Sequence, residues 1–181
     1  MLLYLIRHTS VAVERGTCYG WTDVPVSENF KQEAERTKNI LDGLHFDRVY
    51  TSPLTRAKRL AAYCGYADAT EEPRMKEMHM GDWEMKRFDS ILDPELKDYF
   101  DHYLDVPTKN GESFRDLYRR VSDFLDQLRK TAANDPSIKK VAVFCHGGPI
   151  ICALVYAGLV PLEEGYSNIP DYASVTRIEL K

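Results

Sequence analysis

The sequence has no long hydrophobic run and no surplus of basic residues, and both absences narrow the possible functions. No apolar stretch approaches the roughly 18 residues that a membrane-spanning helix needs, so we expect no association with a membrane. The 28 acidic residues outnumber the 24 lysines and arginines, which gives the chain a net charge of −4. A chain of this charge lacks the basic surface that nucleic acids require. Any anion-binding site must therefore be a local cationic pocket.

The four cysteines form no C-x-x-C pair, and the N-terminal segment lacks the basic region and small-residue cleavage site of a secretory signal. We therefore expect reduced thiols and a cytoplasmic protein. At 181 residues, with 44% hydrophobic and 29% charged residues, the composition is typical of a globular protein and too apolar for disorder. The length predicts one compact domain over residues 1–181.

Apolar segments alternate with amphipathic segments along the chain. Residues 2–6 and 140–145 are continuous apolar runs typical of strands buried on both faces, and shorter strands are expected at 46–50, 69–73 and 175–180. Helices are predicted from Ser27 to residue 44, from Ser52 to residue 64, from Ser113 to residue 128 and from Gly147 to residue 157. This alternation predicts a three-layer α/β/α sandwich around a mostly parallel sheet. Residues 77–111 show no clean period, and we interpret them as an insertion with one or two short helices over the active site.

Two histidines follow predicted strands directly, His8 after the first strand and His146 after the apolar VAVFC segment. Ligands of open α/β sheets bind beyond the carboxyl ends of the strands, so both imidazoles are expected to enter one crevice if these strands are neighbours. Arg7 adjoins His8, and Arg56 lies in the first turn of the helix after the second strand. Gly147 opens a helix beside His146, where free amides and the helix dipole favour an anion. These groups are suited to binding a phosphoryl group.

A neutral histidine can attack phosphorus, because one of its ring nitrogens then carries a lone pair. Burial and neighbouring cations both disfavour imidazolium, so the two arginines would help to keep His8 neutral. The leaving oxygen needs a proton, and Glu77 is a candidate for its donor. Spacing alone leaves Asp82 and Glu84 equally suitable.

Two other chemistries could use residues of the same segments. Cys145 precedes His146, but successive residues of a strand point to opposite faces, so we expect a buried and unreactive thiol. A metal hydrolase could use His8, His146, Glu77 and His79 as ligands. The two arginines would repel a divalent cation at this place, and we expect no metal and no other cofactor.

Four segments resemble the signature of the histidine phosphatase superfamily, in its phosphoglycerate-mutase-like branch: residues 5–9 (LIRHT), 52–57 (SPLTRA), 77–84 (EMHMGDWE) and 145–148 (CHGG). They occur in the order found in that superfamily. Residues 173–178 also resemble the closing strand of that superfamily. Within the superfamily, residues 81–85 and 107–114 look most like those of α-ribazole phosphatases. Those enzymes remove a 5′-phosphate late in the assembly of the cobalamin nucleotide loop.

The resemblance implies a phosphomonoesterase without a metal, in which His8 is the phosphorylated nucleophile and Glu77 the proton donor. It assigns Arg7, Arg56 and His146 to phosphate binding and transition-state stabilisation. The expected substrate is a small phosphomonoester, α-ribazole 5′-phosphate or adenosylcobalamin 5′-phosphate, and the enzyme is expected to be a monomer or a homodimer. The alternatives are a broad-specificity phosphatase, a phosphoglycerate-mutase-like enzyme and a non-catalytic protein that binds a phosphate ligand.

The sequence departs from the family pattern at two positions near the expected nucleophile. Thr9 stands where the family usually has glycine, and Glu14 stands where it often has asparagine. A carboxylate would repel phosphate, so we expect either a rearranged loop or a Glu14 side chain that faces away.

Overall fold

The computed structural model describes residues 1–91 and 96–180. Its centre is a five-stranded sheet in the order β3-β2-β4-β1-β5. The strands are β1 (Leu2–Arg7), β2 (Arg48–Thr51), β3 (Thr70–Glu71), β4 (Lys140–Cys145) and β5 (Val175–Glu179). β5 runs antiparallel to β1, and the other neighbouring strands are parallel. The expected mostly parallel sheet is confirmed, and each strand boundary lies within two residues of its predicted position.

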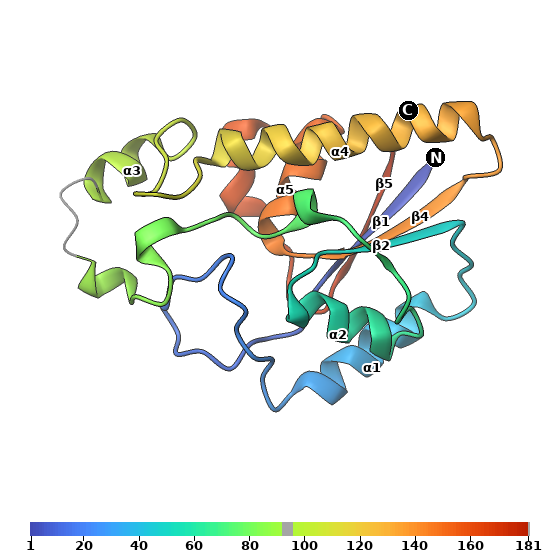
Figure 1. The fold of residues 1–181 in the computed structure, drawn as a ribbon, viewed down its shortest axis with the longest axis horizontal. Coiled ribbons are helices and arrows are strands. Elements are labelled where there is room, and N and C mark those ends of the chain that lie inside the picture. Colours follow the sequence, from blue (N-terminus) through green and yellow to red (C-terminus); the bar gives the residue numbers. More distant parts are fainter. Residues whose placement is uncertain (92–95, 181) are drawn as a thin grey trace.

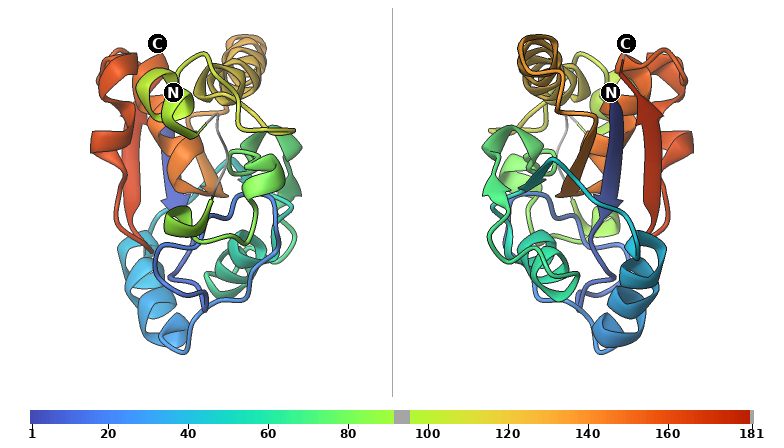
Figure 2. Two further views of the ribbon diagram at one scale, coloured as in Figure 1. Left: turned by 90° about the vertical axis from the view of Figure 1, so that its left-hand side faces the viewer. Right: turned by 90° about the vertical axis from the view of Figure 1, so that its right-hand side faces the viewer.

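Helices cover both faces of the sheet (Figures 1 and 2). One face packs against α1 (Phe30–Leu41) and α2 (Thr55–Tyr63), and the other packs against α4 (Phe114–Asn134) and α5 (Gly147–Tyr156). The side chains of β1 alternate between these layers: Tyr4 and Ile6 face α1 and α2, whereas Leu3 and Leu5 face α4 and α5. Burial on both faces explains why β1 is a continuous apolar run, and the predicted three-layer sandwich is confirmed.

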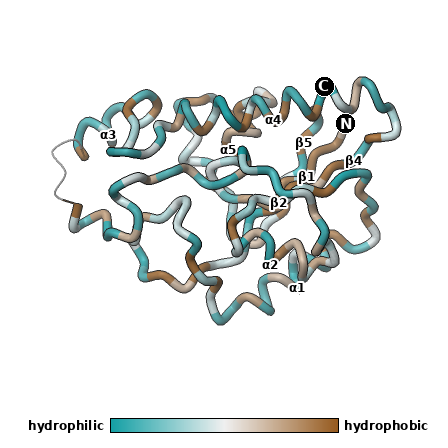
Figure 3. The backbone as a smooth tube through the Cα atoms, in the orientation of Figure 1, coloured by the Kyte–Doolittle hydropathy of each residue, from teal (hydrophilic) through white to brown (hydrophobic). Residues whose placement is uncertain are grey.

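The amphipathic helix α4 begins where the sequence indicated. The Ser113 hydroxyl accepts a hydrogen bond from the Asp116 amide, and the Asp116 carboxylate accepts one from the Ser113 amide, so the helix starts with a capping box. Its buried residues are those at the helical spacing: Phe114, Leu117, Val121, Phe124, Leu125 and Leu128. Figure 3 shows hydrophobic and hydrophilic residues alternating along α4. No described helix is both long and apolar enough to cross a membrane.

The predicted starts of α1 and α2 are wrong by a few residues. α1 begins at Phe30 and not just after Ser27, whose hydroxyl is paired with the Ser10 hydroxyl at 2.6 Å. α2 begins at Thr55, because the Ser52 hydroxyl accepts a hydrogen bond from the backbone amide two residues later and shapes a turn before the helix. In both cases the serine that has the sequence pattern of a helix N-cap forms its hydrogen bonds with loop residues outside the helix.

The insertion lies beyond the carboxyl ends of the parallel strands, on the side opposite the N-terminus (Figure 1). Its described residues contain 3₁₀ turns at Gly81–Trp83 and Phe88–Ser90 and the short helix α3 (Leu96–His102), which makes three short helical segments where one or two were predicted. Trp83 is buried and packs edge to face on Tyr99, with ring centroids 4.9 Å apart. The insertion therefore places an apolar cluster of its own over the edge of the sheet where a ligand is expected.

Candidate active site

His8 and His146 lie side by side at the carboxyl ends of adjacent strands. β1 pairs with β4 in parallel, with Arg7 opposite Cys145, so the two histidines follow their strands at the same level. Their ring centroids are 5.0 Å apart, and both side chains are almost completely buried. The His8 amide donates to the Cys145 carbonyl at 3.0 Å and continues the ladder beyond the strand. The register of the sheet thus brings two distant histidines together.

The surroundings of His8 determine which ring nitrogen carries its proton. Nδ1 lies 2.7 Å from the Thr9 carbonyl oxygen, which can accept but not donate, so Nδ1 carries the proton and Nε2 carries the lone pair. Burial, followed by the charge of Arg56, holds the pKa of His8 well below its ordinary value of 6.5. His8 is therefore a neutral imidazole near pH 7, with a nitrogen lone pair suited to nucleophilic attack.

His146 is a second neutral imidazole, because burial and then the charge of Arg56 hold its pKa well below 6.5. Its Nε2 lies 2.7 Å from the Ser52 hydroxyl. That hydroxyl also accepts a hydrogen bond from the Leu54 amide, and we assign its own proton to the contact with Nε2. The ring proton of His146 then sits on Nδ1, which has no partner among the described residues. No local pattern in the sequence indicated this role for Ser52.

Arg7 and Arg56 direct their charges at both imidazoles, because each lowers the pKa of His8 and of His146. Arg56 is fully buried, and its guanidinium donates to two backbone carbonyls, those of Gly20 at 2.6 Å and Thr22 at 3.0 Å. Arg7 lies under the Tyr172 ring, whose centroid is 3.9 Å from the Arg7 Cζ. No carboxylate of residues 1–91 and 96–180 lies within 4.0 Å of either guanidinium. Both charges are therefore available to an anionic ligand.

Unpartnered donors are concentrated at this place. Six buried side-chain polar atoms lack a hydrogen-bond partner in the described part of the chain, and three of them are Arg7 Nε, Arg56 Nε and His146 Nδ1. A fourth is the hydroxyl of Thr9, which directly follows His8. Buried polar groups are rarely left unpaired in folded proteins, so these donors indicate a ligand with several acceptor oxygens. A tetrahedral oxyanion such as a phosphoryl group meets that requirement.

Glu77, at the start of the insertion, lines a cavity together with Arg7 and His8. Its carboxylate oxygens lie 3.2 and 3.3 Å from the amide nitrogen of Gly148 at the N-terminus of α5. A Cβ on Gly148 would lie 2.2 Å from Glu77 Oε1, so glycine is required there for the carboxylate to approach the helix. Gly147 is equally close to the site, since a Cβ there would lie 3.5 Å from Arg7 Nε. Of the predicted site residues, those that line the cavity are Arg7, His8, Glu77 and Gly147, whereas Arg56 and His146 are fully buried and do not line it.

The other two carboxylates considered as proton donors do not line this cavity. Asp82 is exposed and accepts a hydrogen bond from the Asn110 side chain. Burial would raise the pKa of Glu84, but hydrogen bonds to it, the first of them from the Gly20 amide, outweigh burial and lower that pKa. Glu84 also accepts from the Trp21 and Met80 amides and so fixes the loop whose carbonyls hold Arg56. Of the three carboxylates, Glu77 is therefore the one that lines the cavity together with His8.

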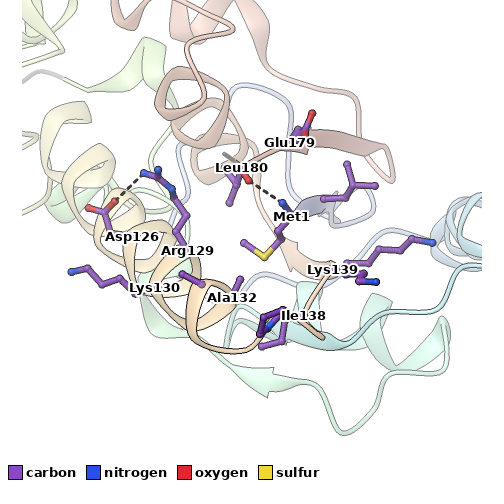
Figure 4. Close-up of a pocket in the computed structure, with 13 residues that line it drawn as sticks. Met1, Asp126, Arg129, Lys130, Ala132, Ile138, Lys139, Glu179 and Leu180 are labelled. Carbon is purple, nitrogen blue, oxygen red and sulfur yellow. Dashed lines mark hydrogen bonds and ion pairs between the residues drawn. The ribbon is translucent and has the colours of Figure 1, made fainter.

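The cavity has a volume of about 550 Å³, and its wall away from the histidines is aromatic. Its aromatic lining residues are Tyr19, Phe88, Tyr99, Phe100, Tyr103 and Tyr166, most of which belong to the insertion. A larger hollow of about 850 Å³ lies at the opposite end of the sheet, between Met1, Arg129 and Glu179 (Figure 4). That hollow contains no histidine or cysteine, so its larger volume does not make it the better candidate site.

The structure explains the departure from the family pattern at Glu14. Glu14 points away from the histidines and pairs with Arg87 at the surface, so its carboxylate does not face the anion site.

Burial raises the pKa of the Cys145 thiol, in agreement with the expected unreactive cysteine. Within the described ranges no group of three or more histidine, cysteine, aspartate or glutamate side chains is arranged to hold a metal ion.

The fold and these side chains define a class: an α/β protein with an oxyanion site at the carboxyl edge of its sheet. Residues 3–181 match the family model of the histidine phosphatase superfamily (branch 1). The chain therefore belongs to the histidine phosphatase superfamily and is a phosphatase, as the expected resemblance implied.

Relatives within the superfamily differ in their activities. The adenosylcobalamin/alpha-ribazole phosphatase of Salmonella typhimurium is 31% identical over 136 residues, which cover 71% of this chain and 67% of that protein. Phosphoserine phosphatase 1 of Hydrogenobacter thermophilus is 29% identical over 190 residues, which cover 99% of this chain and 86% of that one. The crystal structure of the alpha-ribazole phosphatase from Shigella flexneri superposes with a TM-score of 0.88 at 22% identity, covering 100% of this chain and 91% of that chain, and is similar in fold.

Proposed function

We propose that this protein is a phosphomonoesterase that forms a phosphohistidine on His8. One observation carries the proposal: Arg7 Nε, Arg56 Nε and His146 Nδ1 are buried without partners among the described residues, and Nε2 of His8, whose ring lies beside that of His146, is unprotonated. A phosphoryl group offers an oxygen to each donor and offers its phosphorus atom to the lone pair. A protein that merely binds phosphate would need the donors but not the lone pair.

In the first step, the Nε2 lone pair of His8 forms a bond to phosphorus while the bond between phosphorus and the ester oxygen breaks. The ester oxygen keeps the electron pair of that bond, takes a proton from the carboxyl group of Glu77 and leaves as an alcohol. Arg7, Arg56 and the Nδ1 proton of His146 stabilise the charge on the phosphoryl oxygens in the transition state.

In the second step, water attacks the phosphohistidine. A new bond from oxygen to phosphorus forms, the bond between nitrogen and phosphorus breaks, and the electron pair returns to Nε2 of His8. Glu77 is now a carboxylate and accepts a proton from the attacking water, so phosphate is released and the enzyme returns to its first state. The same carboxyl group thus acts as an acid in one step and as a base in the next.

As substrate we propose the 5′-phosphate of α-ribazole or of adenosylcobalamin. The aromatic wall of the cavity suits a flat benzimidazole base, which gains from stacking on aromatic rings. Among the described residues, the charged ones that line the cavity are Arg7 and Glu77, which the reaction itself uses. The ammonium and carboxylate groups of phosphoserine would therefore be desolvated without charged partners. The name of the Salmonella relative supports the same choice.

A broad-specificity phosphatase or a phosphoglycerate-mutase-like enzyme is the second candidate. The observation in its favour is that the phosphoserine phosphatase aligns over 99% of this chain, whereas the cobalamin-related enzyme aligns over 71%. Both candidates share the phosphohistidine chemistry, so they differ in the leaving group that the cavity accepts.

The mechanism is tested with two variants and two classes of substrate. His8→Ala is expected to abolish phosphate release from every substrate, and residual activity within about tenfold of the parent would contradict the nucleophile assignment. Glu77→Gln is expected to lower kcat/KM for alkyl phosphates by about 100-fold but to spare p-nitrophenyl phosphate, whose leaving group needs no proton. Equal losses on both substrates would place the acid elsewhere.

The substrate is tested with a panel of α-ribazole 5′-phosphate, adenosylcobalamin 5′-phosphate, phosphoserine, 3-phosphoglycerate and simple sugar phosphates. Phe100→Ser removes an exposed ring from the cavity wall and is expected to raise KM for α-ribazole 5′-phosphate about threefold to tenfold, without changing KM for a glycerol phosphate. Ile40→Ser, an equally exposed apolar residue on α1, is the matched control. A hundredfold preference for a sugar phosphate or for phosphoserine would contradict the cobalamin-related substrate, and similar kcat/KM values across the panel would favour the broad-specificity phosphatase.

A further inference from the structure

An ion pair outside the cavity joins the loop before α4 to the first turns of that helix. Arg120 Nε donates to Glu112 Oε1 at 2.8 Å, and Arg120 Nη2 donates to Glu112 Oε2 at 2.9 Å, so the contact is bidentate. The two side chains are 16% and 18% exposed, so the pair is largely buried. Neither residue lines the cavity beside His8.

The remaining donors of Arg120 all go to the backbone that carries Glu77. Nη1 donates to the carbonyls of Arg74 at 2.6 Å and Lys76 at 2.7 Å, and Nη2 donates to the carbonyl of Glu77 itself at 2.8 Å. With the two bonds to Glu112, each of the five N–H groups of the guanidinium has an acceptor.

The segment beyond Glu77 is held by the same pair. The His79 amide donates to Glu112 Oε2 at 2.8 Å, so the carboxylate of the pair holds the backbone two residues past Glu77. The indole Nε1 of Trp21 donates to the Glu77 carbonyl at 2.7 Å from the other side. Arg120, Glu112 and Trp21 thus hold the backbone of this extended segment at Glu77 and on both sides of it.

We propose that Arg120 and Glu112 are positioning residues for the proton donor Glu77, an inference that rests on the role proposed for Glu77 above. Glu77 lies in an extended segment without helix or strand hydrogen bonds of its own, so the position of its backbone depends on the contacts described above. Proton transfer to the leaving oxygen needs heavy atoms within about 2.6–3.2 Å, and a displacement of about 1 Å is enough to slow it strongly. Loss of the pair should therefore affect the steps in which Glu77 moves a proton and leave the attack of His8 intact.

The test compares Arg120→Met with Arg119→Met, the same substitution at the preceding, exposed residue of α4. The parameter kcat/KM includes steps only as far as phosphorylation of His8, so it isolates the first proton transfer. Arg120→Met is expected to lower kcat/KM for an alkyl phosphate about 30-fold and for p-nitrophenyl phosphate less than about threefold. Arg119→Met is expected to change neither value by more than about twofold.

A second readout follows from the base role of Glu77 in the hydrolysis of phosphohistidine. Displacement of Glu77 slows that step, so Arg120→Met is expected to release p-nitrophenolate in a burst of about one equivalent per enzyme before a slower steady state. A residue needed merely for folding would lower the amount of active enzyme and would produce no burst. Arg120→Lys, which keeps the charge but loses the planar fork, is expected to restore less than half of the activity on the alkyl phosphate.

Glu112→Gln keeps the shape of the side chain, and it is the variant to use if Arg120→Met does not fold. It is expected to show the same substrate dependence with a loss of about fivefold to tenfold on the alkyl phosphate. Suppose that Glu77→Gln separates the two substrates. If Arg120→Met and Glu112→Gln then cause equal losses on both substrates, or no loss on either, the positioning role is wrong. If Glu77→Gln itself does not separate them, the proposed acid is wrong and the positioning role falls with it.

Discussion

Acidification should destabilise this protein before its carboxylates begin to titrate, because His8 and His146 are buried as neutral imidazoles. Their pKa values are held well below 6.5, first by burial and then by the charge of Arg56. In the unfolded chain the same side chains return to about 6.5 and take up protons as the pH falls. The unfolded state then binds more protons than the native state, so the free energy of unfolding decreases.

The magnitude follows from that difference in bound protons. The stabilising contribution of each histidine is complete above the unfolded pKa of about 6.5 and is lost as the pH falls from there through the lower native pKa. For one imidazole that stays neutral in the native state, a change from pH 7.5 to 5.5 removes about 1.4 kcal/mol. Together His8 and His146 remove about 2.7 kcal/mol, a large share of the 5–15 kcal/mol that typically stabilises a domain.

The assay is urea unfolding at pH 7.5 and 5.5 in a buffer without phosphate, with the free energy extrapolated to zero denaturant. His8→Gln and His146→Gln each remove one titrating group, so each should reduce the difference between the two pH values by about 1.4 kcal/mol. His45→Gln, the same substitution at an exposed histidine outside the site, is the matched control. An equal difference in the parent and in both active-site variants would refute the reasoning, because the loss would then come from other groups.

Three further results are expected from the site geometry. Gly148→Ala should lower kcat/KM for alkyl phosphates about tenfold or more while sparing p-nitrophenyl phosphate, because the new Cβ would displace Glu77; equal losses would argue against this. Tyr172→Leu, which removes the ring over Arg7, should weaken competitive inhibition by inorganic phosphate about threefold to tenfold, whereas Tyr172→Phe should not. Excess chelator should leave turnover unchanged, because Arg7 and Arg56 repel a divalent cation; loss of activity that added metal restores would contradict this.

The parts of the site that follow directly from strands could be predicted from the sequence. β1 and β4 are apolar on both faces, so they had to be central, and the residues after them had to meet at one edge of the sheet. That argument places His8, His146 and Arg7 together without any knowledge of side-chain contacts. The start of α4 could also be predicted, because a capping box is a local interaction between residues three positions apart.

The supporting residues could not be predicted, because their partners are distant in the sequence. Ser52 has the pattern of a helix cap, yet its hydroxyl is held by a histidine 94 residues away. Arg120 lies on an amphipathic helix at a position that the helical spacing leaves unspecified, and its partners come from two other segments. Periodicity reports which face of an element is buried, but it does not report which polar group will be opposite.

Two buried arginines, Arg56 and Arg120, show how the partners of a guanidinium decide its use. The charge of Arg120 is compensated locally by the Glu112 carboxylate, so this arginine has no charge left for a ligand. Arg56 is buried at least as deeply, but its partners are carbonyl oxygens, which orient the guanidinium without neutralising it.

A phosphate dianion would supply the counterion that the carbonyl partners of Arg56 do not, so binding phosphate offsets the unfavourable free energy of burying this charge. Arg56→Met should therefore weaken competitive inhibition by inorganic phosphate about 10- to 100-fold, as expected for the loss of a charged hydrogen bond. The same substitution at Arg120 should change that inhibition by less than about threefold, because its charge is already paired. Similar losses in the two variants would mean that phosphate affinity depends on the general integrity of the fold and not on an uncompensated charge at Arg56.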